Sequence, residues 1–521
     1  MDASAKTIAK PARWLFGALA SLVAFVAMAA PGPALAEWVR AESPRFVVYG
    51  AGDERYVRGY AEKLEAFEQV LRAYHGMAPE AAPPRKFEVY LVSGLGQLRR
   101  VKPDADESTG GFYSAGVEKV FAVVRRDFGD DQILFHEYTH HFMSQHFPYG
   151  YPAWVVEGYA EYFGGTRVDD QFIDVGAGEA GRTYVLTNLR HLALSDLLTR
   201  RPGELKGDQV KAYYAQAWLL THYMLSDPAR KQQMDAYLRA VGAGENPARA
   251  MAQATGMDLD MLGRKLKAYD KLTYTRVPRS AAGAEIRVSH LPPSADDLLL
   301  ESIRPHETVP PAEQPAFLEK IRTLASKHHG DPLAYLTAAK AEISFGDRPG
   351  GEAILRFLLK ANPDNAEALE LLGMSRLASG DEASDPVAQK TFYREARPYL
   401  IKAGQKDPTR YQTLFAYVRS RSLEDGYPND NDLNALLAAR ALAPQVSEIT
   451  LRAAEALDRR KRPAEAVAIL TPVANDPHQA DAAAAARAVL ARVKPIDQKP
   501  PAIPATTSAP LAGAGATDKQ R

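Results

Sequence analysis

A short histidine–glutamate motif is the part of the sequence best suited to metal chemistry. His136, Glu137 and His140 form the pattern HExxH within HEYTH. On a helix, residues four apart lie roughly 40° apart around the axis, so the two imidazoles face one point and can bind one zinc ion. Glu137, roughly 100° round the helix from His136, lies beside the metal and suits a base acting on metal-bound water. The motif therefore predicts a zinc site with two histidine ligands.

A catalytic zinc site needs a third protein ligand and one open position. His146 follows the motif at a spacing similar to that of the metzincins. That pattern requires a glycine to turn the chain back to the metal. Met143 stands in its place, so the helix continues and His146 points roughly 80° away from His136. Glu157, in the segment PAWVVEGYAEYF at residues 152–163, is the better candidate.

The segment around Glu157 resembles the gluzincins: peptidase-MA-like families of unknown function and, more distantly, the aminopeptidase N and thermolysin families. In those families a second helix beginning W-x-x-E-G-x-A supplies a glutamate as third zinc ligand, and Trp154, Glu157, Gly158 and Ala160 match that pattern. The resemblance implies an α+β zincin-like catalytic domain with Glu157 as the third metal ligand. The 16 residues between His140 and Glu157 are slightly fewer than in the two well-known families and fit the lesser-known ones.

Two further groups could assist the reaction. Glu161, one turn after Glu157, could orient a zinc-bound histidine; a solvated or capping glutamate is the alternative. Peptide hydrolysis also needs a donor for the developing oxyanion, and the resemblance implies a histidine or tyrosine on a later helix. We predict Tyr214 as this catalytic donor, with Tyr213 second; ordinary core tyrosines are the alternative.

These residues together predict an exported zinc metallopeptidase of the gluzincin type that acts on a peptide or protein substrate. Zinc lowers the pKa of its bound water, and Glu137 takes the proton and passes it to the leaving amine. The main alternative is a catalytically silent peptidase-like domain on a protein-interaction scaffold. A structural zinc site is a third reading, weakened by having only three obvious ligands.

The segments before the motif predict the elements that position it. Residues 45–49 (RFVVY) and 87–92 (FEVYLV) are rich in β-branched and aromatic residues and predict strands, and residues 54–75 have helical spacing. Residues 110–125 predict a hairpin. The resemblance implies that its second strand, 120–124, is an edge strand that binds substrate backbone; a buried core strand is the alternative.

The C-terminal half has the pattern of helical repeats. Residues 311–495 are rich in alanine and leucine, with helix-length segments between short turns. Residues 362–381 resemble the first helix of a tetratricopeptide repeat (TPR), followed after an insertion of about eleven residues by a second helix. Residues 462–477 resemble another second helix. We predict an all-α TPR-like domain whose concave face binds a protein partner, with a generic helical bundle as the alternative.

The remaining segments complete the predicted organisation. Residues 37–275 form the predicted catalytic domain and 276–310 a linker or capping segment. Residues 1–36 predict a cleaved secretory signal, because a basic stretch, an apolar run and an A-x-A site follow one another; an uncleaved anchor is the alternative. We therefore expect a periplasmic or secreted protein. Residues 496–521 predict a disordered tail.

The composition of the 521-residue chain excludes several classes of function. Cysteine is absent, which excludes disulfides, cysteine nucleophiles and thiolate metal ligands. Lysine plus arginine equals aspartate plus glutamate at 64 each, so no positive excess favours nucleic acid or an anionic membrane surface. Any metal here must be held by histidine and carboxylate.

Overall fold

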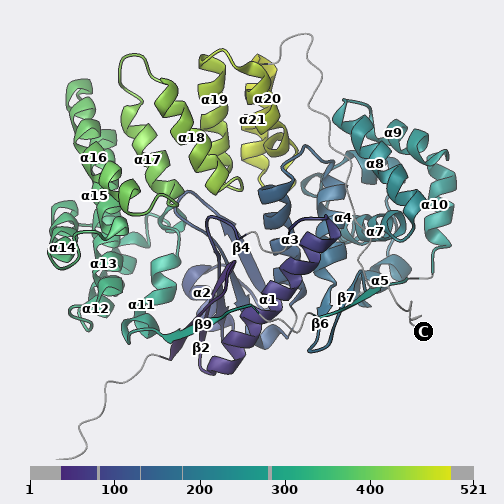
Figure 1. Ribbon diagram of the computed structural model, residues 1–521, viewed down its shortest axis with the longest axis horizontal. Helices are drawn as coiled ribbons and strands as arrows, with labels where there is room; N and C mark the ends of the chain where they lie inside the picture. Colours follow the sequence, from purple (N-terminus) through teal and green to yellow (C-terminus); the bar gives the residue numbers. More distant parts are fainter. Residues whose placement is uncertain are drawn as a thin grey trace, which may run out of the picture.

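The chain has a mixed α/β part followed by an array of helices (Figure 1). The structure is a computed structural model, and it describes residues 37–78, 82–129, 131–178, 180–270, 272–279 and 284–493. No helix within these ranges is long and apolar enough to cross a bilayer. The predicted signal segment, 1–36, and the predicted tail, 496–521, lie outside the described residues.

A six-stranded sheet forms the base of the α/β part, with the order β4-β5-β3-β2-β1-β9. Strands β2, β3 and β5 run parallel, and the other neighbours pair antiparallel. The predicted strands and hairpin are present within a few residues of their expected bounds. The strands are β1 (Trp38–Glu42), β2 (Phe46–Ala51), β3 (Phe87–Val92), β4 (Gly111–Ala115), β5 (Val120–Arg125) and β9 (Arg287–His290).

The expectation that residues 120–124 form the edge strand is wrong. Strand β5 pairs with β3 on one side and with β4 on the other, and all of its residues are buried. It is the core strand of the alternative interpretation. The edge of the sheet is β4 instead, whose residues are only partly buried.

Both faces of the sheet are covered because its strands alternate apolar side chains between two cores. Val89 and Leu91 of β3 face α1 (Glu54–Tyr74), while Tyr90 and Val92 face the opposite side. That side is covered by α2 (Leu95–Val101) and α11 (Ser294–Ile303). Strand β9 and helix α11 both come from the predicted linker or capping segment, so these parts of it pack onto the sheet.

A group of helices and a small sheet follow β5 and carry the HExxH motif. Helix α3 (Gln132–His146) holds the motif, α4 (Ala153–Gly164) holds Glu157, and α7 (Asp208–Leu225) crosses α4. The other elements are β6 (Arg167–Val168), β7 (Phe172–Val175), β8 (Thr275–Pro278), α5 (Ala180–Asn188), α6 (Leu194–Thr199), α8 (Pro228–Gly242), α9 (Pro247–Thr255) and α10 (Leu259–Lys267).

Gly158 allows α4 and α7 to approach closely. A β-carbon at this position would lie 2.6 Å from the backbone oxygen of Ala217 and would also collide with Oγ1 of Thr221. The absence of a side chain next to Glu157 therefore sets the depth at which α4 packs.

We expect Gly158→Ala to destabilise the protein by about 1–3 kcal/mol, because the crossing helices must separate to admit a methyl group. Gly59→Ala is the control, since a β-carbon on Gly59 of α1 has no neighbour within 4 Å. That change should be neutral or stabilise by up to about 1 kcal/mol. Thermal unfolding of the two variants measures the difference, and equal midpoints would contradict the close approach.

The C-terminal part is an array of antiparallel helices. Helices α15 and α16 pack closely at Gly373, where a β-carbon would lie 2.6 Å from Leu400. The expected insertion after residue 381 forms no long loop but extends the second helix. The helices are α12 (Gln314–Ala325), α13 (Pro332–Phe345), α14 (Arg348–Ala361), α15 (Ala366–Glu382), α16 (Pro386–Lys406), α17 (Tyr411–Arg421), α18 (Asp430–Leu442), α19 (Ser447–Arg459), α20 (Pro463–Asn475) and α21 (Ala480–Val493).

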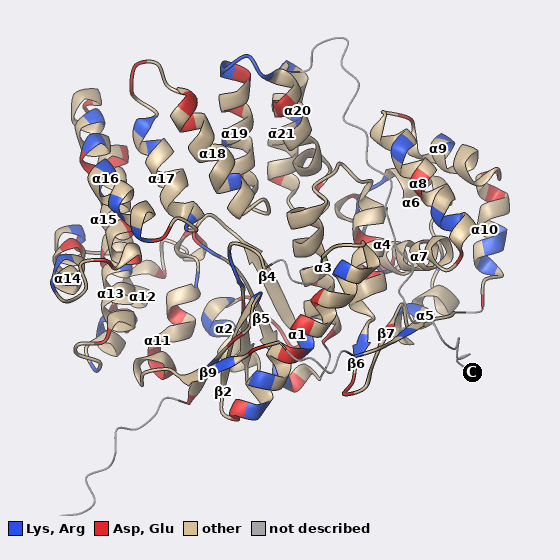
Figure 2. Ribbon diagram, in the orientation of Figure 1, with Lys and Arg blue, Asp and Glu red and all other residues tan. Residues whose placement is uncertain are grey.

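The array curves back to the α/β part, so that α20 and α21 lie beside α3 (Figure 1). The Tyr411 hydroxyl donates to the Gly116 carbonyl after β4 at 2.9 Å, and the Asn475 amide donates to the Gly150 carbonyl before α4 at 2.9 Å. One apolar cluster runs from the sheet through α3 and α4 to α21. Charges of both signs are mixed over the array in Figure 2. The array and the α/β part therefore share a core.

Candidate metal centre

Helix α3 turns one face to the core and the other to a cleft. Phe135 and Tyr138 are buried, and the Phe135 ring stacks on Phe67 of α1 with centroids 4.1 Å apart. The Tyr138 hydroxyl donates to Glu68 of α1 at 2.8 Å. Because this apolar stripe fixes the rotation of the helix, the histidines of HExxH come to lie on the face that meets α4.

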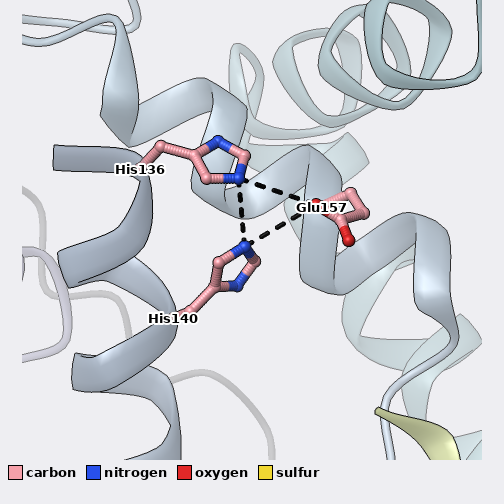
Figure 3. A group of neighbouring side chains, drawn as sticks. All are labelled: His136, His140 and Glu157. Atoms are coloured by element: carbon pink, nitrogen blue, oxygen red, sulfur yellow. Dashed lines mark hydrogen bonds and ion pairs between the residues drawn. The ribbon is translucent and has the colours of Figure 1, made fainter. Parts of the chain in front are cut away.

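His136, His140 and Glu157 converge on one point (Figure 3). The two Nε2 atoms lie 3.1 Å apart, and Glu157 Oε2 lies 3.7 Å from His136 Nε2 and 3.6 Å from His140 Nε2. Four ligands at 2.0–2.1 Å from a tetrahedral ion lie about 3.3–3.4 Å from one another. The structure thus brings together the three predicted ligands at separations close to those of a metal site.

The environment of Glu157 fits a cation. Its side chain is 0 % exposed, and neither carboxylate oxygen makes a hydrogen bond of good geometry. Burial opposes ionisation, but the imidazoles of His140 and His478 outweigh it and hold the pKa of this carboxyl well below its ordinary value. A buried carboxylate without hydrogen bonds is costly unless a positive charge compensates it. The donor set of two imidazoles and a carboxylate could supply three ligands to a divalent ion.

Both histidines are largely buried, but their surroundings shift their pKa values in opposite directions. Their side chains are 14 % and 10 % exposed for His136 and His140. Burial lowers the pKa of His140, which favours the neutral imidazole that a metal requires. In the metal-free chain, burial also lowers the pKa of His136, but hydrogen bonding and charge from Glu161 outweigh it and raise the pKa.

The Glu161 carboxylate contacts His136 at Nδ1, the ring nitrogen that does not face Glu157. Its Oε1 lies 3.3 Å from His136 Nδ1, and its two oxygens accept hydrogen bonds from Arg182 of α5 at 2.6 Å each. Such a contact can fix which imidazole nitrogen faces the metal. The sequence offered Glu161 as a candidate for this position, whereas nothing in the sequence around Arg182 indicated its part.

The two candidate tyrosines are in different places. The Tyr214 ring lies beside His136, with centroids 6.5 Å apart, and Arg182 lies 5.8 Å from the Tyr214 ring. Burial raises the pKa of Tyr214, so its hydroxyl keeps its proton. Tyr213 is fully buried and donates its hydroxyl to the Arg200 carbonyl at 3.1 Å. Only Tyr214 is therefore near the candidate metal site.

The other two histidines of α3 belong to the core side. His146 packs against the Phe142 ring with centroids 4.6 Å apart and is outside the candidate metal cluster. His141 Nδ1 lies 3.1 Å from the Tyr113 hydroxyl of β4. The position of His146 agrees with the expectation that it is not a ligand, and His141 also lies outside the candidate metal cluster.

A cleft of about 630 Å³ leads to the site between the α/β part and the helical array. One wall is the edge strand β4, from Gly111 to Ala115, and Glu137 and His140 form part of its floor. Residues of α18, α19, α20 and the loop before α21 also line the cleft. An extended peptide could pair with the free edge of β4 and reach Glu137.

A third histidine at the site, which no sequence pattern indicated, lines this cleft. His478, between α20 and α21, has its Nε2 3.0 Å from Glu157 Oε1 and 3.2 Å from His140 Nε2. It is 338 residues from His140, and no motif surrounds it. Only the curvature of the array brings it to the site.

Comparisons with known proteins assign no family to the chain. No family model and no curated protein matches it. Among solved structures, a thermophilic TPR protein of Thermus thermophilus is similar, with 19 % identity and a TM-score of 0.30. The similarity covers 34 % of this chain and 92 % of that chain. A likeness at this level carries no conclusion about function.

Proposed function

We propose that the protein is an exported zinc metallopeptidase that hydrolyses peptide bonds, with His136, His140 and Glu157 as metal ligands. The observation that carries this proposal is the fully buried Glu157 carboxylate, whose Oε2 faces two imidazole nitrogens within 4 Å. Two neutral imidazoles and a carboxylate are donors that suit zinc. Thiolate ligands are excluded, since the chain has no cysteine.

Support for peptide chemistry comes from the surroundings of the three ligands. When bound, zinc supplies Lewis acidity that polarises a carbonyl and lowers the pKa of water. Glu137, on the cleft floor beside His140, is placed to take a proton from the attacking water and to give it to the leaving amine. The edge strand β4 along the same cleft can hold the substrate backbone. The resemblance to the gluzincins and their zincin fold agrees with this arrangement.

Metal content and peptidase activity together test the proposal. The purified protein should contain about one zinc per chain and should cleave members of a mixed peptide library, and His136→Ala should lose both properties. Zinc without cleavage, at several pH values, would favour a silent domain or a structural site. Absence of bound zinc after incubation with the ion would exclude the metallopeptidase.

The second candidate function is a protein-interaction scaffold, which the helical array favours. A cavity of about 1160 Å³ opens among its helices, and its lining carries charges of both signs, including Lys340, Glu370 and Arg410. Curved helical arrays of this kind present extended surfaces to protein partners. The two functions are compatible, since a partner or substrate could dock on the array and enter the cleft.

Tyr214 is the proposed donor to the developing oxyanion. Tyr214→Phe removes the hydroxyl but keeps the ring beside His136, so kcat should fall by about 10²–10³-fold with little change in metal content. Tyr213→Phe is the matched control: its hydroxyl binds the Arg200 carbonyl, and its loss should leave kcat within about twofold. Equal rates for Tyr214→Phe and the parent would remove Tyr214 from the mechanism.

Glu161 is the proposed positioning residue for His136. Glu161→Gln keeps the shape of the side chain but removes the charge, so zinc affinity should fall by about 10–100-fold. Competition with a chromophoric chelator measures this change. Glu319→Gln, on the exposed face of α12, is the control and should bind zinc like the parent. An unaltered dissociation constant for Glu161→Gln would show that the contact does not support the metal.

A further inference from the structure

The loop between α20 and α21 presents His478 to the metal site. Its conformation is held by local contacts, because Asp476 accepts the backbone N–H of His478 at 2.7 Å and Pro477 restricts the chain between them. The loop is also tied to the α/β part, since Asn475 donates to the Gly150 carbonyl at 2.9 Å and Arg201 donates to the Ala474 carbonyl at 2.9 Å. The helical array thus holds the His478 imidazole beside Glu157, where it lines the cleft.

His478 brings a third imidazole nitrogen to the predicted ligands, because its Nε2 lies 3.0 Å from Glu157 Oε1. Its Nε2 lies 3.2 Å from His140 Nε2, which itself lies 3.1 Å from His136 Nε2. An imidazole nitrogen carries at most one hydrogen, so His140 Nε2 cannot donate to both neighbours. Glu157 lies against all three rings: its Oε2 faces His136 and His140, and its Oε1 faces His478. Three imidazoles and a carboxylate form a donor set that a divalent cation accepts.

We propose that His478 is a fourth protein ligand, with which the helical array closes the metal site of the α/β part and slows the entry of substrate. The proposal rests on the metal site proposed above. Catalytic zinc sites keep a position for water or substrate, whereas sites with four protein ligands are closed. The His478 side chain remains 41 % exposed, and it lines the cleft with Glu137 and His140. Substrate can bind only after the α20–α21 loop withdraws its imidazole.

Cobalt substitution of the full chain tests this role through the metal itself. Co²⁺ with four protein ligands absorbs more strongly in the visible range than Co²⁺ with three protein ligands and added water. We expect His478→Ala to weaken visible absorption and to raise the Co²⁺ dissociation constant roughly tenfold or more, the lower limit for losing a supporting group around a metal. His478→Gln should likewise weaken the visible absorption and raise the Co²⁺ dissociation constant. His329→Ala, which removes an exposed imidazole from the array, is the control and should match the parent.

Peptide turnover gives the second readout. His478→Ala should raise kcat/KM for the zinc-loaded protein, because the position for substrate is open without movement of the loop. A Co²⁺ spectrum and dissociation constant equal to those of the parent would overturn the proposal, as would a fall in turnover, which would assign His478 to substrate binding. A parent chain that binds no Co²⁺ would overturn the metal site as a whole, so the two failures are distinguishable.

Discussion

Replacing Glu137 with glutamine should lower kcat for peptide hydrolysis by about 10²–10⁴-fold, the usual contribution of a general base. Glutamine keeps the size of the side chain and its place on the cleft floor beside His140 but cannot accept a proton from water. Because Glu137 is not among the three clustered ligands, zinc content should stay the same. Steady-state rates on one peptide, with metal analysis of the same samples, measure both effects.

The control for this experiment is the thermal midpoint of the zinc-loaded variant, which should match that of the parent. An unchanged midpoint and zinc content with a large loss of kcat would assign the effect to chemistry. If Glu137→Gln cleaved peptides at the parental rate, Glu137 would not be the base, and the proposed mechanism would be wrong even if zinc were present.

Removing Glu157, the proposed third ligand, should cause a large loss of zinc affinity and of peptide turnover. Glu157→Ala leaves two imidazoles on one helix and takes away the buried carboxylate that neutralises the cation. Loss of a supporting contact costs about 10–100-fold in affinity, so loss of the ligand itself should cost more than about 100-fold. Zinc affinity by chelator competition and peptide turnover should fall together.

Glu301→Ala is the matched control for Glu157→Ala. Glu301 is also a fully buried glutamate, but it lies on α11 and pairs with Arg100 and Lys320 at 2.9 and 2.7 Å. Its loss should lower stability and leave zinc affinity unchanged. Equal zinc affinity in Glu157→Ala and Glu301→Ala would show that the Glu157 carboxylate is not a ligand.

Local patterns were sufficient to predict most elements that position the site. The strands β2 and β3, the helix α1 and the hairpin have strong periodicity over six or more residues, so their sequences determine them with little help from the rest of the chain. The edge position of β4 was not predictable in the same way. Whether a hairpin strand lies inside a sheet or at its edge depends on which distant strand pairs with it.

Long-range contacts account for the features that the sequence did not reveal. Strand β9 has four residues, and its main-sheet partner is β1, about 250 positions earlier in the chain. No local signal predicts such a pairing, because the strand is short and largely exposed. A boundary near residue 275 could be drawn from prolines, but not the return of the chain to the sheet.

The residues of the candidate site also fall into two groups: those that the sequence predicted and those that only long-range contacts bring together. His136, Glu137 and His140 lie within little more than one helical turn, so their spacing predicted them, whereas the resemblance to the gluzincins predicted Glu157. Arg182 and His478 reach the candidate site only through tertiary contacts. The position of His478 depends on the summed curvature of the helical array, which small rotations between successive helices determine.

Anomalous scattering at the zinc absorption edge, from a crystal of the protein grown with zinc, would locate the ion in the folded chain. We expect one strong peak within about 2.0–2.2 Å of His136 Nε2, His140 Nε2 and a Glu157 oxygen, between α3 and α4. Absence of a peak at that position, with the three side chains ordered and the zinc concentration well above micromolar, would contradict the proposed metal centre and the peptidase built on it.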